Sequence, residues 1–505
     1  MRKTTAAATR AAVESPNMRT ANTGTRATRA MVRTFARFHS GTGAEFSVGM
    51  GSRVRAAMPC HPPSPTTLGA MGRHAVRPRP GPRPAAVLLL LVGVVAVVAV
   101  AALWRPWQEA PSAAPQEPPS TAPPSATAEP TAEPSPTPEP LPDARFTIIG
   151  GGDVLPHATV IRTAATGDGY DFVPMMEATA AYTRGADLAL CNLEVPVAPQ
   201  GTAPTGYPMF GAPEELPADL ARLGWDGCST GTNHTLDRGM DGLVRTLDLM
   251  DAAGLGHVGS ARSQEEADSA QWYELEREGQ TIRVAQLAAT YGTNGIPVPA
   301  DSPWAVELID ADRIVRMAGE AREAGADLVV ASIHCCSEYS GTPHPDQVAL
   351  AETLAESGQV DLVLGHHAHV PQPIEKLSGG PGGNGMWVAY GLGNFISNQD
   401  ELCCVPQTAT GLLALAHVVK PDGEPARVES MEWTAVTVDR VGGQRLHVLS
   451  DLLAGERPEG LMLTDQQVAS RYQQVLDVVG DAATERTEPP EPTGPPPTVV
   501  PRTPR

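Results

Sequence analysis

Between residues 145 and 480 the chain alternates short apolar, β-rich runs with stretches of helical periodicity. This alternation is typical of an α/β fold, so we expect a layered α/β sandwich. Strands are expected at 146–153, 186–194, 225–234, 256–260, 326–335, 360–369, 386–395, 410–420 and 426–439. Helices are expected at 172–183, 213–223, 242–253, 311–324, 346–357 and 465–479.

Polar side chains stand where these predicted strands end. They are Asp153, Glu194, Asn233, His234, His334, Glu338, His366, His367, His369 and Asn394. In α/β sheets the loops after the carboxyl ends of strands gather around one crevice, so we expect these side chains to meet there. A single one, such as Asn233-His234, could simply cap the following helix. Taken together, they predict a metal centre.

The segment VDLVLGHHAHVPQP, residues 360–373, ends an apolar run in three histidines. It could be a histidine-rich turn without function. If it is extended, alternate residues point to the same side, so His367 and His369 can reach one ion or two adjacent ions. His366 would then face away, toward a supporting residue or the substrate.

Mixed ligation by carboxylate, amide and imidazole disfavours a structural zinc site, which prefers Cys and His. It suits two divalent ions about 3.5–4 Å apart, which activate water and hold both oxygens of a phosphoester in hydrolysis. Mn, Zn, Fe and Mg are all compatible with these residues.

Residues 85–104 form a run of 20 residues without charge or proline, about the length that crosses a bilayer as a helix. Several arginines precede this run and Arg105 follows it, which predicts a single span with a cytoplasmic N-terminus and an extracytoplasmic domain. The alternative is a cleaved signal peptide, whose apolar region is usually shorter. We expect 1–84 to be a disordered basic segment, or an upstream extension if translation starts at Met71.

Residues 105–144 are rich in Pro, Ala, Ser, Thr and Glu, which predicts a semi-rigid stalk that gives reach or only a tether. The segment 481–505 repeats this composition and is predicted to be a disordered tail after a domain at 145–480. Residues 1–84 carry 14 Lys/Arg and 2 Asp/Glu, against 23 and 55 in the remaining chain. The predicted extracytoplasmic part is therefore strongly acidic. This charge disfavours nucleic acid as a partner and repels polyanions.

Six ordered motifs carry a resemblance to a known family. GDV, NLEVPV, TNHTLDRG, HCCSEYSGTPHPDQ, GHHAHV and YGLGNF lie between residues 146 and about 400. They resemble the CapA family of capsule synthesis, which is implicated in poly-γ-glutamate formation and belongs to the calcineurin-like metallophosphoesterase superfamily. The resemblance implies a metallo-dependent phosphatase-like fold.

The resemblance also implies roles for single residues. The implied metal ligands are Asp153, Glu194 as the bridging carboxylate, Asn233, His334, His367 and His369. His234 would be a general acid or phosphate contact, and Glu338 a substrate-binding or supporting residue. The superfamily's Asp-x-His motif is absent, because Val154-Leu155 follow Asp153 and the next histidine is His157; this weakens the claim of catalysis more than that of the fold.

Cysteines add a local hypothesis, because disulfides form outside the cytoplasm. We expect at least one bridge between the pairs Cys335-Cys336 and Cys403-Cys404; thiolate metal ligands are the alternative. Cys191 and Cys228 are expected to be buried and unreactive. Cys60, on the predicted cytoplasmic side, should stay reduced.

The sequence therefore predicts a membrane-anchored protein of envelope polymer synthesis with metallophosphoesterase-like hydrolase or transferase chemistry. A non-catalytic accessory protein that binds poly-γ-glutamate, another polymer or a membrane synthase complex is the alternative. A binding module of polysaccharide-modifying machinery is a third possibility.

Overall fold

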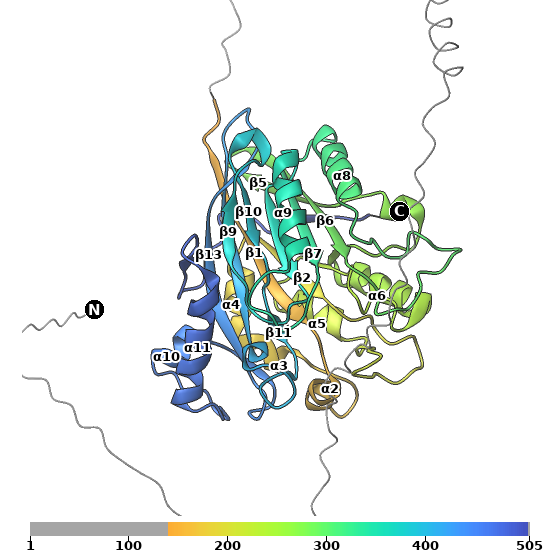
Figure 1. The fold of residues 1–505 in the computed structure, drawn as a ribbon, viewed down its shortest axis with the longest axis vertical. Helices are drawn as coiled ribbons and strands as arrows, with labels where there is room; N and C mark the ends of the chain where they lie inside the picture. The colour runs from red at the N-terminus through yellow and green to blue at the C-terminus, as the bar shows by residue number, and fades with distance from the viewer. Residues whose placement is uncertain (1–139, 503–505) are drawn as a thin grey trace, which may run out of the picture. The chain divides into compact units, whose positions relative to one another are not determined.

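The computed structural model describes residues 140–502, which form a domain of two β-sheets covered by helices (Figure 1). The first sheet has nine strands, with the path β14-β13-β12-β1-β2-β3-β4 and with β11 beside β1 and β15 beside β13. Its strands are β1 (Ala144–Val154), β2 (Leu188–Leu193), β3 (Gly227–Ser229), β4 (Gly256–Val258), β11 (Asn394–Ile396), β12 (Thr410–Lys420), β13 (Arg427–Asp439), β14 (Arg445–Val448) and β15 (Thr484–Glu485).

The second sheet has seven strands in the order β16-β5-β6-β7-β8-β10-β9. They are β5 (Gln271–Arg277), β6 (Gln280–Thr290), β7 (Leu328–His334), β8 (Leu362–His366), β9 (Ile374–Leu377), β10 (Met386–Ala389) and β16 (Thr498–Val500). Strands β1 to β4 run parallel to one another, as do β6, β7, β8 and β10. The layered α/β sandwich is confirmed.

Alternate residues of the central strands enter different cores, as the two-residue period of a strand requires. Ile148 of β1 joins Leu190, Leu328 and Leu364 in the core between the sheets. Its neighbour Ile149 points to the opposite face, into a core with the helices that cover the first sheet. These strands are largely apolar because both of their faces are buried.

Helices cover the outer faces of the sheets. They are α2 (Ala158–Ala164), α3 (Val173–Met176), α4 (Ala180–Gly185), α5 (Leu216–Arg222), α6 (Gly239–Ala253), α7 (Gln264–Ala267), α8 (Ala311–Glu323), α9 (Pro345–Ser357), α10 (Leu449–Leu453) and α11 (Asp465–Val479). Helices α8 and α9 lie on the second sheet (Figure 1), where Ile314, Met317 and Leu354 are buried. Local signals set their ends: Asp310 caps α8, and α9 begins at Pro345 and stops before Gly358.

The prediction that 481–505 is a disordered tail is wrong for residues 481–502. Strand β15 pairs with β13, and β16 adds to the edge of β5. Between these strands, Thr493 donates hydrogen bonds to the buried carboxylate of Asp187, and after β16 Arg502 is only 9% exposed. Composition misled the prediction because proline is compatible with an edge strand and with extended connections. The domain therefore extends to residue 502 instead of 480.

The predicted segments 1–84 and 85–104 lie outside the described residues, as does nearly all of the stalk 105–144. Within residues 140–502 no helix has both the length and the apolar character needed to cross a membrane.

The structure also contains elements that the sequence did not predict. The β5–β6 hairpin is the largest of them, and β9, β14, β15, β16, α2 and α10 are shorter. The hairpin matters for the site, because the end of β6 at Thr290 pairs in register with His334 of β7.

Candidate metal centre

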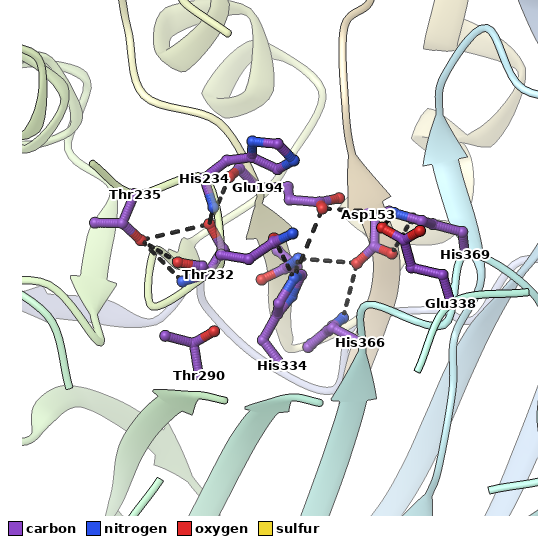
Figure 2. Close-up of polar contacts among 12 residues, drawn as sticks. Asp153, Glu194, Thr232, His234, Thr235, Thr290, His334, Glu338, His366 and His369 are labelled. Atoms are coloured by element: carbon purple, nitrogen blue, oxygen red, sulfur yellow. Dashed lines mark hydrogen bonds and ion pairs between the residues drawn. The ribbon is translucent and has the colours of Figure 1, made fainter. Parts of the chain in front are cut away.

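The predicted ligand residues lie together where strands of both sheets end. Figure 2 shows four of them, Asp153, Glu194, His334 and His369. Asp153 is the penultimate residue of β1, and Glu194 directly follows β2. His334 ends β7 and His366 ends β8 in the second sheet. The parallel strands of each sheet carry these side chains to a shared edge, as expected for a ligand site of an α/β fold.

Asp153 is fully buried and held from several sides. Its Oδ2 lies 3.0 Å from Nδ1 of His369, and its Oδ1 accepts a hydrogen bond from Asn192 Nδ2 at 2.9 Å. His366 Nδ1 approaches Oδ1 at 3.6 Å. Burial alone would raise the pKa of Asp153, but its interactions with the neighbouring rings of His366 and His369 outweigh burial and hold the pKa well below its usual value. Asp153 is therefore an anion ready to bind a cation.

The approach of β1 to the neighbouring loop requires glycine. A Cβ at Gly152 would collide with the carbonyl oxygen of Gly393. With glycine there, the Asp153 N–H donates to the Gly393 carbonyl at 2.8 Å. The GGGD sequence thus places the Asp153 carboxylate against the second sheet.

Glu194 occupies the middle of the cluster. Its Oε1 lies 3.6 Å from Nε2 of His334 and 3.6 Å from Nε2 of His369. Burial raises the pKa of Glu194 well above its usual value, although His369 opposes the shift. Within residues 140–502 neither carboxylate oxygen has a hydrogen-bond partner. Such a carboxylate is costly unless a cation compensates it.

The histidine-rich segment is not extended, which corrects the reasoning from its sequence. β8 ends at His366, and both His367 (φ 80°) and His369 (φ 57°) have left-handed backbones. A tight turn, and not strand alternation, brings His367 and His369 together, with their ring centroids 5.9 Å apart. Non-glycine residues pay for this conformation, and such strain often accompanies function.

An extended segment would have turned His366 away from the cluster, but His366 does not face away. Its ring points into the cluster toward Asp153 (Figure 2) and is 2% exposed. Both of its ring nitrogens lack a hydrogen-bond partner among the described residues. A turn, unlike a strand, allows three nearly consecutive side chains to converge.

His334 and Asn233 form another side of the cluster. His334 Nε2 lies 2.9 Å from Asn233 Oδ1, and the His334 and His367 rings are 4.8 Å apart. Burial, reinforced by neighbouring histidines, lowers the pKa of His334 well below its usual value and that of His367 to about 3. Both rings are therefore neutral and can act as ligands.

His369 is the exception among these rings. Burial would lower its pKa, but Glu194 and Asp153 raise it to about 10. The two buried carboxylates thus favour the protonated form of this ring.

The two residues predicted for catalysis lie at the edges of the cluster. His234 Nδ1 is 2.7 Å from Asp237 Oδ2, which also accepts the Phe210 N–H at 2.7 Å. Glu338 Oε1 lies 4.0 Å from His369 Nε2, and its side chain is 39% exposed. His234 is therefore fixed by a carboxylate, while Glu338 is accessible from solvent. These roles stay predictions.

Sequence reasoning missed the contribution of the loop after β6. The Tyr291 ring lies 4.5 Å from the His367 ring and is 43% exposed. Asn294 contacts both Asn233 and His234. The alternating pattern of residues 271–290 was the available signal, since it predicts a hairpin whose second strand ends at this site. Asn394 was expected at the crevice, but its side-chain amide donates to the backbone of His369 and Thr408.

The disulfide prediction is wrong. Cys335 is bonded to Cys336, and Cys191 to Cys228, whereas Cys403 and Cys404 lie side by side with sulfurs 2.7 Å apart. Cys191 and Cys228 are buried as expected, but they are paired. Their strands β2 and β3 are neighbours in register, which the separation of 37 residues in the sequence does not reveal.

Three overlapping groups of side chains can hold a metal ion. They are Asp153, Glu194 and His369; Glu194, His334 and His367; and Glu338, His367 and His369. Ligand atoms within each group lie within 4.8 Å of one another. Oxygen and imidazole nitrogen donors suit Mn, Fe, Zn or Mg. The buried oxygens of Glu194 and Nδ1 of His367, which have no hydrogen-bond partner in the described part of the chain, fit such an ion.

Fold and site together define a two-sheet α/β domain with a buried candidate centre for divalent metal ions. Residues 147–399, half of the chain, match the family described as "Bacterial capsule synthesis protein PGA_cap". The chain belongs to this family, as the resemblance of its motifs implied.

Several known proteins are similar to part of this chain. The PGA biosynthesis protein CapA of Bacillus subtilis is 30% identical over 171 residues, which are 34% of this chain and 42% of that protein. The capsule biosynthesis protein CapA of Bacillus anthracis is 27% identical, over 37% of this chain and 44% of that protein. The "Probable polyglutamine synthesis accessory protein" of Mycobacterium tuberculosis is 27% identical, over 51% of this chain and 68% of that protein. The matches thus span less than half of the two Bacillus proteins.

Solved structures resemble the domain only weakly. The NAD nucleotidase of Haemophilus influenzae has a TM-score of 0.37 at 13% identity and covers 68% of this chain and 64% of that one. The calcineurin-like phosphoesterase YfkN of Bacillus subtilis has a TM-score of 0.34 at 14% identity and covers 66% and 98%. At such low scores, nothing about the activity of this chain follows from them.

Proposed function

We propose that this protein is a metal-dependent hydrolase or transferase of the metallophosphoesterase type that acts in the synthesis of poly-γ-glutamate, capsule or another envelope polymer. Membership of the capsule synthesis family supports the polymer context. The names of the Bacillus relatives, which state PGA and capsule biosynthesis, support the same context.

The observation that carries the chemical part of the proposal is the position of Glu194. Its Oε1 lies at the same distance, 3.6 Å, from His334 Nε2 and His369 Nε2. Glu194 also belongs to two ligand groups, one with His334 and His367 and one with Asp153 and His369. One carboxylate shared by two ligand groups suits a pair of adjacent ions.

The residues that would hold the ions follow from these groups. Asp153 and His369 would hold one ion, and His334 and His367 the other, with Glu194 shared between them. Asn233, whose Oδ1 lies 2.9 Å from His334 Nε2, would be a further ligand beside His334. When bound, two such ions lower the pKa of a bound water and stabilise the attacking and leaving oxygens of a phosphoester. The histidine expected two residues after Asp153 is absent, and His366 lies near this aspartate instead.

Protein side chains supply the remaining functions. Asp237 Oδ2 accepts hydrogen bonds from His234 Nδ1–H and from the Phe210 N–H, because a carboxylate can only accept. The Nε2 atom of His234 is thereby left to exchange a proton with substrate. Glu338, whose side chain is partly exposed to solvent, is placed to contact a substrate group beside His369.

The location of the protein belongs to the same proposal. We infer that residues 85–104 anchor it in the cell membrane, with the N-terminus in the cytoplasm and the described domain outside. The apolar run and the arginines that precede it support this orientation.

A non-catalytic accessory role is the second candidate. It is favoured by Leu155, a buried aliphatic residue at the position where the phosphoesterase motif has a metal-binding histidine. In that role the cluster would bind an ion and a polymer or synthase without turnover.

The two candidates are separated by metal content and turnover of the full chain, purified in detergent. Hydrolysis of bis(p-nitrophenyl) phosphate and of a γ-glutamyl peptide is measured for wild type, Asp153→Ala, Glu194→Gln and His369→Ala. Glu352→Gln, which changes an exposed carboxylate on α9, is the control.

We expect two ions per chain and a loss of about 100-fold or more in turnover for the three site variants. Bound metal with no turnover on either substrate supports the accessory role. A wild-type protein that binds no divalent ion contradicts the proposed centre.

A further inference from the structure

The loop after β6 brings Asn294 against Asn233. Asn233 Nδ2 donates to Asn294 Oδ1 at 3.2 Å, while Asn233 Oδ1 faces His334 Nε2 at 2.9 Å. Its two amide ends therefore point in opposite directions, one toward the ligand cluster and one toward the loop.

The direction of this amide decides whether Asn233 can be a ligand. Only its oxygen can bind a cation, because the amide NH₂ is a donor without a free lone pair. If the amide turned over, the NH₂ would face His334 and the ions. The NH₂ end of the Asn233 amide donates to the Asn294 carbonyl, and this contact keeps the oxygen end toward the cluster.

We propose that Asn294 is a positioning residue that holds the oxygen of Asn233 toward the metal centre. This inference rests on the proposed metal centre and adds a residue that neither the motifs nor the strand ends indicated. The Asn294 carbonyl can accept from Asn233 only when the Asn233 oxygen faces inward.

The backbone around Asn294 keeps its side chain in place. Asn294 (φ 51°) and Gly295 (φ 78°) both have left-handed conformations, which form a tight turn. Asparagine tolerates this conformation better than other residues with a side chain. The loop is also fixed at its start, where the Tyr291 N–H donates to the His334 carbonyl at 3.0 Å.

The second contact of Asn294, with His234, is not an equivalent hydrogen bond. Asn294 Nδ2 lies 3.4 Å from His234 Nδ1, but this ring nitrogen already donates to Asp237 at 2.7 Å. Two donors cannot bond to each other, so Asn294 only packs against the ring here. Its effect on the metal centre therefore runs through Asn233.

The test compares Mn²⁺ binding by the full chain, in detergent, for wild type, Asn294→Gly, Asn294→Asp, Asn233→Ala and the double variant N233A/N294G. Calorimetry gives affinity and stoichiometry, and thermal unfolding in EDTA reports on folding. Glycine removes the side chain without opposing the left-handed backbone, and aspartate keeps an acceptor at the same place. Glu278→Gly, at a left-handed position (φ 50°) in the β5–β6 turn, is the matched control.

We expect N294G to bind the second Mn²⁺ about 10- to 100-fold more weakly, as is usual when a residue that orients a ligand is lost. N294D and Glu278→Gly should bind it within about threefold of wild type, a margin set by the context dependence of such contacts. N233A/N294G should bind no more weakly than N233A, and the melting temperature of N294G in EDTA should not fall.

Wild-type binding by N294G would overturn this inference without affecting the proposed metal centre. Additive losses in N233A/N294G would do the same. A melting temperature that falls together with binding in N294G would show a structural role and also overturn it. If wild type binds no Mn²⁺, both the proposed metal centre and this inference are wrong.

Discussion

The Nδ1 atom of His369 lies 3.0 Å from the Oδ2 atom of Asp153, although the two residues are 216 positions apart in the sequence. Asp153 comes from the first sheet, and His369 from a turn after a strand of the second. The candidate metal centre is thus also a junction between the sheets. Binding of an ion should therefore stabilise the fold.

Removal of metal should lower the stability of the wild-type protein. At a free Mn²⁺ concentration 100 times the dissociation constant, binding contributes about 2.7 kcal/mol, and EDTA abolishes this contribution. Glu194→Gln should melt at the same temperature with Mn²⁺ and with EDTA, because it lacks the shared carboxylate. Thermal unfolding by circular dichroism checks this, with Glu352→Gln responding like wild type. An equal response to EDTA in Glu194→Gln would contradict the role of Glu194.

Replacement of Arg502 by alanine should destabilise the domain by about 2–4 kcal/mol, because a buried guanidinium and its hydrogen bonds are lost. This side chain donates to the carbonyls of His257 and Ser260 at 2.9 and 3.2 Å and to that of Glu266. Urea unfolding gives the difference, and Arg316→Ala, with a half-exposed side chain on α8, is the control. A chain that ends at residue 480 should lose more stability than the Arg502→Ala variant. Equal stability of all these proteins would show that the tail only lies on the surface.

Asp226 should make stability fall as the pH rises. Burial raises its pKa from 3.8 to about 7, opposed by a hydrogen bond from the Ala189 N–H. Because the folded-state pKa is the higher one, the contribution is complete below about pH 4 and is lost as the pH rises to about 7.

Asp226→Asn keeps an acceptor for the Ala189 N–H and removes the loss of stability that ionisation of Asp226 causes at higher pH. Its stability relative to wild type should therefore increase by about 2–4 kcal/mol between pH 4 and pH 8. Urea unfolding across this pH range measures the difference, and Asp346→Asn, whose carboxylate is 85% exposed, is the control. A constant difference would mean that Asp226 ionises normally in the folded protein.

The cysteine arrangement predicts a specific peptide map. Digestion without reductant should yield a linked peptide for Cys191 and Cys228 and an internal link between Cys335 and Cys336. Cys403 should react with iodoacetamide, with a midpoint near pH 6, because the hydrogen bond with Cys404 lowers its pKa from 9.0 to about 6. Labelling in urea is the control and should return the midpoint to an ordinary value. A link between Cys335 or Cys336 and Cys403 or Cys404 would contradict the structure.

Much of the fold could be predicted because local patterns carry it. The apolar runs at 326–335 and 360–369 gave β7 and β8, and the predicted helices 311–324 and 346–357 match α8 and α9 within a residue. The β5–β6 hairpin was missed, and with it Tyr291 and Asn294. The Pro-rich composition of 481–502 hid two short strands, because edge pairing depends on a neighbouring strand more than on local propensity.

The sequence by itself determined which strand ends carry carboxylate, amide and imidazole groups, since periodicity and motif order are local properties. It also determined the family, through the order and spacing of the motifs. Only the tertiary structure decided which of these groups meet. His366 points inward because the chain turns immediately after it, and Cys191 pairs with Cys228 because β2 and β3 are neighbours. The position of Glu194 between two histidines depends on the packing of one sheet against the other, a long-range arrangement that no local pattern records.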